Sequence, residues 1–240
     1  MSQMKHFFIQ IRFPLFLIAL LFFFIVYPYF HLKFPEQIAI VEVFFAMLMV
    51  TGVSLLIDRR KMLVVMVALA ILILFGILFT GYTENKVILL ITMFVELAFF
   101  FIIFGSLIAF IYSQQRVTLN KLYAAVTSYL VLGIIFALLY AIIAVNSPDA
   151  FQYTISNYMI PKKIFPHPVF FSEALYFSFV TLGTLGYGDW VPMFGPIKMI
   201  ASLEAIIGQL FIAILIARLV GIQISQSLLQ RETKRNKFIN

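Results

Sequence analysis

The chain has 240 residues, 63% of them hydrophobic and only 11% charged, and its mean hydropathy is +1.07. A soluble domain of this size cannot bury so much apolar surface, so the composition indicates an integral membrane protein. The absence of cysteine excludes disulfides and thiolate metal sites, and the basic residues behind the net charge of +7 cluster at segment ends, which favours retention on one side of a bilayer over nucleic-acid binding.

Six apolar segments have about the 20 residues that a transmembrane helix needs. In chain order they are residues 13–30, 38–57, 62–79, 87–112, 122–145 and 197–220. The first follows basic residues as a signal peptide does, but it is rich in aromatics and lacks a small-residue cleavage site, so we keep it as a helix. The sequence therefore predicts an all-α membrane protein with six transmembrane helices.

Six crossings place both termini on the same side of the membrane. Of the 17 basic residues, twelve then share the side of the termini, and the other five are Lys33, Lys86, Lys162, Lys163 and Lys198. Because cytoplasmic segments carry the excess of lysine and arginine, we expect both termini in the cytoplasm and the protein in the cell (inner) membrane.

Between the fifth and sixth apolar segments, residues 171–182 are apolar but too short to cross a bilayer. They lead into the run Thr184, Leu185, Gly186, Tyr187 and Gly188, a polar turn that is tolerated at membrane depth only where it is buried in protein or lines water. Glycine at alternate positions lets the backbone switch hand at little energetic cost, so successive carbonyls can face one axis. A ring of such carbonyls can replace the water shell of a cation.

This run resembles the selectivity filter of potassium channels, usually Thr-Val-Gly-Tyr-Gly, and the similarity extends from Ala174 before it to Pro192 after it. The resemblance implies a homotetramer with a central pore, because one chain supplies only one strand of a closed ring. It implies that potassium ions, rather than any cofactor, are held by the backbone carbonyls of Thr184, Leu185, Gly186 and Tyr187 and by the Thr184 hydroxyl. Gly188 would complete the outer mouth.

Residues around the filter are expected to hold its width. We expect Tyr187 to pack against Tyr176 and Phe177 of the half-helix, which would begin with Ser172 as N-cap and Glu173 in its first turn.

Three positions depart from patterns common in relatives, and the replacement of valine by Leu185 is the mildest of them. Gly183 replaces a second threonine, and Val180 replaces a glutamate that would pair with Asp189. Asp189 must therefore find another partner, such as Trp190 or Tyr176.

The chain divides into three parts. Residues 1–112 form a four-helix transmembrane domain, 113–222 form the pore domain with an irregular outer loop at 146–168, and 223–240 form a short basic cytoplasmic tail. In voltage-gated relatives the fourth helix carries repeated arginines, whereas residues 87–112 contain only Glu96 as a charged residue. Because an uncharged helix does almost no work in the membrane field, we expect weak or no voltage dependence.

The sixth segment contains Gly208, with Ile212 and Ile216 following at four-residue spacing on the same helix face. In related channels a glycine near this position serves as a bending point, whereas in any helix pair a small residue permits close packing. The sequence gives both interpretations equal weight. If this face lines the pore, the isoleucines form an apolar ring that can gate by dewetting. Arg218 is expected to reach the inner headgroups.

Three carboxylates, Glu42, Glu96 and Glu204, lie inside predicted spans. Structural hydrogen bonding is favoured over ion transport for all three, and we expect serine or threonine hydroxyls to satisfy Glu204 behind the filter.

The sequence thus indicates a potassium-selective channel that conducts passively. It shows no nucleophile–base pair, phosphate loop or metal cluster that would indicate an enzyme. The expected partners are identical subunits, potassium ions and membrane lipid. Alternatives are a less selective monovalent cation channel, a potassium transporter subunit, and a membrane sensor or scaffold with a vestigial pore; a transporter subunit would typically carry four degenerate pore elements, and this chain carries one.

Overall fold

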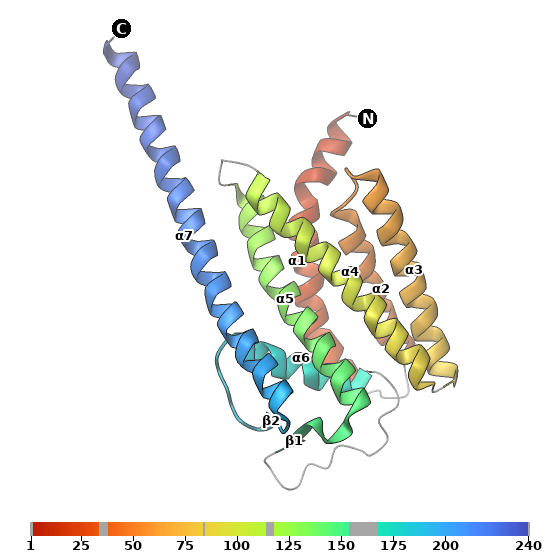
Figure 1. Ribbon diagram of the computed structural model, residues 1–240. Coiled ribbons are helices and arrows are strands. Elements are labelled where there is room, and N and C mark those ends of the chain that lie inside the picture. Colours follow the sequence, from red (N-terminus) through yellow and green to blue (C-terminus); the bar gives the residue numbers. More distant parts are fainter. Residues whose placement is uncertain (1, 34–37, 84, 114–117, 154–167, 240) are drawn as a thin grey trace.

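The computed structural model describes residues 2–33, 38–83, 85–113, 118–153 and 168–239 (Figure 1). The elements in chain order are α1 (Ser2–Lys33), α2 (Ile38–Ser54), α3 (Arg60–Thr83), α4 (Lys86–Ser113), α5 (Leu119–Asn146), the single 3-10 turn η1 (Pro148–Ala150), β1 (Phe151–Tyr153), α6 (Pro168–Leu182), β2 (Trp190–Pro192) and α7 (Gly195–Ile239).

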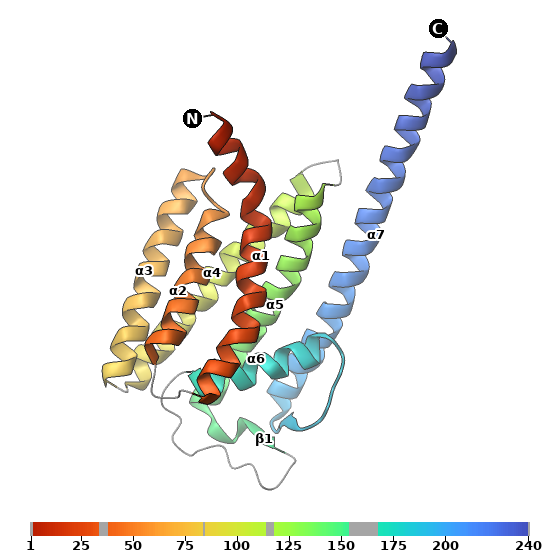
Figure 2. The ribbon, with the colours of Figure 1, turned by 180° about the vertical axis from the view of Figure 1, so that it is seen from behind.

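A helix coincides with each of the six apolar segments. The long helices α1, α2, α3, α4, α5 and α7 alternate in direction, so both ends of the chain lie at one end of the bundle, and α6, β1 and β2 lie at the other (Figures 1 and 2). Within the described residues, four helical stretches are long and apolar enough to cross a membrane: Arg60–Thr80, Lys86–Ser113, Leu119–Asn146 and Gly195–Gly221. The described apolar parts of α1 and α2 are shorter, so crossing by these two helices stays a prediction.

Helix α5 is the centre of the packed structure. It contacts α1, α4, α6 and α7, and 72% of the residues in its most apolar stretch are buried. For α3 and α7 the buried share is only 11%. Their exposed apolar side chains suit lipid or another protein surface, because nothing in a single chain removes them from water.

Small and aromatic side chains bring the helices together. A Cβ on Gly133 would lie 2.6 Å from the Phe179 ring, so the glycine lets α6 pack closely on α5. The ring of Phe24 on α1 meets Phe179 edge-on, with centroids 4.9 Å apart. Helix α1 therefore contacts α6 as well as α5.

One predicted boundary was wrong. The short helix already runs from Pro168, so Ser172 lies within it rather than at its N-cap and Glu173 lies beyond its first turn. The membrane-length stretch of α7, Gly195–Gly221, agrees with the predicted span 197–220, and the helix then continues through the polar tail to Ile239. Polar residues do not stop a helix when they lack proline and have good helix propensity, as this tail does.

The outer loop also contains regular structure. Strand β1 pairs antiparallel with β2, with Phe151 opposite Pro192 and Tyr153 opposite Trp190. This pairing ties the segment after α5 to the residues that follow the filter. The remainder of the predicted loop, 154–167, lies outside the described residues.

Candidate ion-conduction site

The backbone between α6 and β2 alternates in hand. Thr184, Gly186 and Gly188 have φ angles of +56°, +59° and +73°, whereas Leu185 and Tyr187 between them do not have positive φ. Thr184 is the one described non-glycine residue with positive φ, and this conformation is strained for a β-branched side chain. The alternation expected from the glycine spacing is therefore present, and it starts at Thr184, two residues before the first glycine of the alternating run.

The start of this loop is hydrogen-bonded to the end of α6. The amides of Gly183, Thr184 and Leu185 donate to the carbonyls of Phe179, Thr181 and Val180 at 2.9, 2.9 and 2.8 Å. The carbonyl of Leu182 accepts the Tyr129 hydroxyl at 3.1 Å. Carbonyls at the end of a helix have no partner within it, so these bonds fix the loop directly to the helix end.

The loop surface is open in a single chain. Residues 183–188 are all exposed, with Leu185 at 61% and Tyr187 at 67%. At membrane depth an exposed irregular backbone must line water or be covered by protein. The surface therefore has the character of a site that further subunits complete.

Asp189 is held by two donors at the outer end of the loop. The Tyr176 hydroxyl donates to Oδ2 at 2.7 Å, and the Trp190 backbone amide donates to Oδ1 at 2.9 Å. The hydrogen bond to Asp189 raises the pKa of Tyr176 to about 12. Tyr176 is thus the side-chain partner of Asp189, and Trp190 contributes through its backbone rather than its indole.

Two aromatic groups support the loop. The rings of Tyr176 and Tyr187 are nearly parallel, at an interplanar angle of 4° and a centroid distance of 6.5 Å. Phe177 lies elsewhere than expected. It faces Trp190 edge-on at 5.3 Å, in a buried group to which Tyr140 and Phe151 also belong.

This aromatic group joins four elements: α5, β1, α6 and β2. The stacked pair of Phe151 and Trp190, with centroids 4.2 Å apart, lies at the β1–β2 pairing. Sequence reasoning missed Tyr140 and Phe151, because their partners are distant in the chain.

Behind the loop, Glu204 joins three helices. Its Oε1 lies 2.5 Å from the Ser178 hydroxyl of α6, and its Oε2 accepts the Tyr140 hydroxyl of α5 at 2.6 Å. Ser178 Oγ also lies 2.8 Å from the carbonyl oxygen of Gly133. All three side chains are fully buried. The predicted serine partner of Glu204 is confirmed, and Tyr140 is an additional one. Of the other carboxylates, Glu96 is fully buried on α4, and the side chain of Glu42 lies outside the described residues.

Gly208 packs against the end of α6. A Cβ at this position would lie 2.6 Å from the Leu182 carbonyl oxygen, so only glycine fits without a shift. Helix α7 runs unbroken through Gly208. Ile212 is half-buried and Ile216 is 55% exposed. Close packing is therefore the role of Gly208 in this structure, and pore lining by the isoleucines stays a prediction.

Two further contacts of α7 were not expected. Gln209 Nε2 lies 3.4 Å from the Thr184 hydroxyl, so a side chain of α7 reaches the strained residue of the loop. A polar residue in an otherwise apolar span was the signal that could have found it. Arg218 donates to the Tyr112 carbonyl at 3.3 Å, and its guanidinium lies 3.7 Å from the centre of the Tyr112 ring. Arg218 thus links α7 to the end of α4 instead of simply reaching headgroups.

A short helix that ends in a loop of alternating backbone hand, set among membrane-length helices, is the arrangement of a membrane pore protein. Comparison with known proteins agrees. A family model described as Ion channel matches residues 124–223, from α5 through α6 and the loop into α7. Protein LctB of Bacillus caldotenax is 30% identical over 108 residues, which are 45% of this chain and 76% of that protein. No solved structure matches. The chain belongs to the ion-channel family.

Proposed function

We propose that the protein is a homotetrameric, potassium-selective channel that conducts passively through the loop 184–188. The observation that carries this proposal is the alternating backbone of Thr184, Gly186 and Gly188 at the end of a short helix. In such a backbone the carbonyls of residues 184–187 can face one axis, and four chains place four oxygens in each layer. The proposed ligands are those carbonyls and the Thr184 hydroxyl.

The surrounding structure supports a loop of constant width. The Tyr176–Asp189 hydrogen bond holds its outer end, the bonds to α6 hold its start, and Gln209 reaches Thr184 from α7. A ring of backbone carbonyls held in place can replace the hydration shell of a potassium ion. The exposed apolar face of α7 suits the contact with neighbouring copies and the lower pore.

We propose that the first four helices carry no gating charge. Both termini are proposed to lie in the cytoplasm. Helix α4 carries a basic residue only at its first position, Lys86. The membrane field supplies about 2.3 kcal/mol per charge per 100 mV, so a helix without a repeated series of arginines or lysines responds little to voltage. A steep conductance–voltage relation that disappears when these helices are altered would contradict this part.

The test is potassium flux from liposomes that contain the purified protein, followed by bi-ionic reversal potentials with potassium on one side and sodium on the other. We expect flux, and a reversal potential that strongly favours potassium. Equal permeation of sodium would indicate a less selective cation channel. No flux from a correctly assembled tetramer would indicate a sensor or scaffold.

A further inference from the structure

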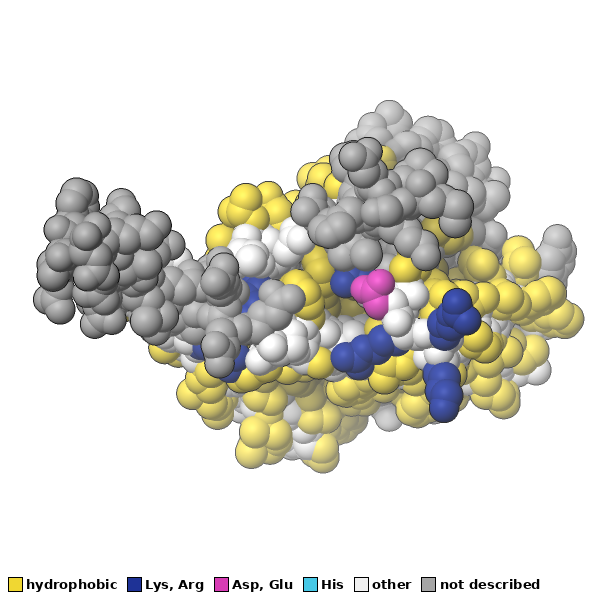
Figure 3. All heavy atoms as spheres, turned by 90° about the horizontal axis from the view of Figure 1, so that it is seen from above, with side chains coloured by type: hydrophobic (Ala, Val, Ile, Leu, Met, Phe, Trp, Pro, Cys, Tyr) yellow, Lys and Arg dark blue, Asp and Glu magenta, His cyan; other side chains and the backbone are white. Residues whose placement is uncertain are grey.

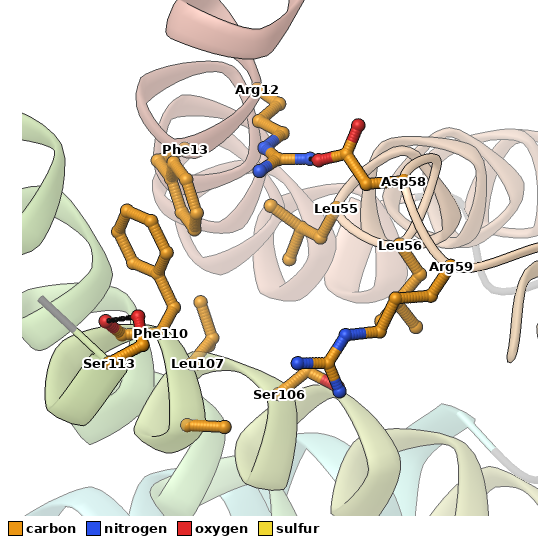
Figure 4. Close-up of a pocket in the computed structure, with 11 residues that line it drawn as sticks. Arg12, Phe13, Leu55, Leu56, Asp58, Arg59, Ser106, Leu107, Phe110 and Ser113 are labelled. Atoms are coloured by element: carbon orange, nitrogen blue, oxygen red, sulfur yellow. Dashed lines mark hydrogen bonds and ion pairs between the residues drawn. The ribbon is translucent and has the colours of Figure 1, made fainter.

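A cavity of about 180 Å³ lies at the opposite end of the bundle from the loop 184–188. It is lined by α1, by the connection between α2 and α3, and by α4, and it is partly open to the outside. The polar groups that line it are Arg12, Asp58, Arg59, Ser106 and Ser113 (Figure 4). None of these residues takes part in the proposed conduction path.

The cavity holds more positive than negative charge. Arg12 forms an ion pair with Asp58 at 2.5 Å, and its side chain is only 12% exposed. Arg59, by contrast, has no ion pair within the part of the chain that the structure describes, and its one recorded side-chain contact is with the Met62 sulfur at 3.9 Å. In Figure 4 the Arg59 guanidinium points across the cavity toward Ser106. The cavity lining therefore holds two guanidiniums but only one carboxylate, and Arg12 is the one paired with it.

The guanidinium group of Arg12 also has a nitrogen without a hydrogen-bond acceptor among the described residues. Arg12 Nε is buried, and it donates no hydrogen bond within the described residues. A buried donor without an acceptor is costly, so an added acceptor at this point would be stabilising. Guanidinium groups bind phosphate oxygens in paired hydrogen bonds. A phosphate group would therefore supply both the hydrogen-bond acceptors and the negative charge that the two arginines lack.

The rest of the lining is apolar. Phe13 and Phe110 stack with centroids 4.2 Å apart, and Leu55 and Leu107 lie beside them. On the face of the protein that carries the chain ends, Lys and Arg side chains gather around a small acidic patch (Figure 3). Basic pockets between helices at the cytoplasmic side are a known setting for anionic lipid headgroups. A charged opening above apolar walls suits an amphiphile better than a fully hydrated ion.

We propose that this cavity binds the phosphate group of an anionic amphiphile, with Arg59 as the principal ligand and Arg12 as the second. A liquid water occupies about 30 Å³, so the cavity has room for roughly six waters, or for a phosphate and its adjacent ester groups. Acyl chains would lie outside it, against the apolar helix surfaces. The bound phosphate would join α1, the α2–α3 connection and α4 at the end where α4 leads toward α5.

The experiment uses the full chain in nanodiscs or detergent and measures lipid retained in native mass spectrometry together with the midpoint of thermal unfolding. The probes are phosphatidylglycerol, phosphatidylcholine, and inorganic phosphate added to phosphatidylcholine samples. The variants are Arg59→Gln and the matched control Arg60→Gln, because Arg60 is an exposed arginine next in sequence that does not line the cavity. A second variant, Ser106→Leu, fills the cavity without removing charge.

Phosphatidylglycerol should bind the wild type and Arg60→Gln alike and about tenfold more weakly to Arg59→Gln, which is the loss expected for one charged hydrogen-bonded pair. Ser106→Leu should also lose the binding of phosphatidylglycerol. Stabilisation by inorganic phosphate alone would identify a free phosphate as the source of the same chemistry. Equal loss in Arg59→Gln and Arg60→Gln, or no preference of the wild type for phosphatidylglycerol over phosphatidylcholine, would overturn the proposal. The readout is lipid binding, so its failure leaves the proposed conduction untouched.

Discussion

The contact of Gly208 with the end of α6 permits a sharp test of how the loop is supported. Replacing Gly208 by alanine places a Cβ 2.6 Å from the Leu182 carbonyl oxygen and 2.9 Å from Leu182 Cδ1. Ordinary contacts begin at 3.4 Å, so the two helices must separate by about 0.8 Å or the end of α6 must move. The carbonyl oxygen cannot swing away as a side chain could, because it also accepts the Tyr129 hydroxyl at 3.1 Å.

The expected magnitude has two opposing parts. Overfilling a packed contact costs about 1–3 kcal/mol, whereas replacing glycine by alanine within a helix contributes about 1 kcal/mol in the other direction. Gly221→Ala is the matched control on the same helix, because a Cβ there meets no atom within 4 Å. Gly208→Ala should therefore be about 1–3 kcal/mol less stable than Gly221→Ala.

The assay is reversible unfolding of both variants in mixed micelles, with potassium flux from liposomes as the functional readout. Since Leu182 directly precedes the loop, Gly208→Ala should also reduce potassium flux or selectivity, and Gly221→Ala should leave the loop undisturbed. Equal stability of the two variants, with normal selectivity in both, would refute the packing argument. A change in the balance of open and closed states alone would favour the alternative that Gly208 is a bending point.

The buried carboxyl, the outer mouth and the strained loop give three further predictions. Tyr140→Phe should lower the free energy of unfolding by about 1–3 kcal/mol, because Glu204 Oε2 loses its donor in a buried site; a phenylalanine variant as stable as the wild type would contradict this. The pKa of Tyr176 lies at about 12, above its ordinary value of 10.0, so the hydrogen bond to Asp189 stabilises the folded protein fully below pH 10, and this stabilisation is lost as the pH rises through about 12. In an NMR titration of labelled tyrosine, Asp189→Asn should bring the pKa of Tyr176 back toward 10.0. An unchanged titration would exclude the hydrogen bond. Gly186→Ala, at a φ of +59°, should cost about 1–2 kcal/mol and abolish potassium flux while the oligomer persists in size-exclusion chromatography; normal flux would show that this backbone conformation is not needed.

The hydrogen bonds around Glu204 predict that its carboxyl group is protonated. Ser178 has one hydroxyl proton but lies within bonding distance of both Glu204 and the Gly133 carbonyl. Both acceptors are satisfied if Glu204 carries a proton and donates to Ser178, which then donates to Gly133. We expect an infrared carbonyl band of a protonated carboxyl group that Glu204→Gln removes; its absence at neutral pH would indicate an ionised Glu204 that accepts the Ser178 proton.

Local chemistry was enough to predict the backbone of the candidate site. Glycine at 186 and 188 permits positive φ whatever surrounds it, and a half-length apolar segment before it cannot cross a bilayer. Hydropathy likewise placed a helix at every apolar segment. These features depend on neighbours within a few residues, so a single sequence contains all the information they need.

Boundaries and partners depended on more than local sequence. Helix α6 contains Ser172, since no residue nearby enforces a helix start at that position, and α7 continues as a helix beyond its apolar stretch, since nothing nearby enforces a stop. The pairing of β1 with β2 brings Phe151 next to Trp190, and Phe177 packs against both rings.

By itself, then, the sequence determined that this is a helical membrane protein with a loop of alternating backbone hand after a short helix. Only the tertiary structure decided which distant residues pair: Tyr140 with Glu204 behind that loop, 64 positions apart, and Arg218 with Tyr112 where α7 meets the end of α4, 106 positions apart. The physical reason is that backbone preference and hydropathy act over one or two helical turns. The choice of a partner depends on how α4, α5, α6 and α7 pack, and apolar helices of similar composition can pack in many ways until small residues and buried polar groups select one.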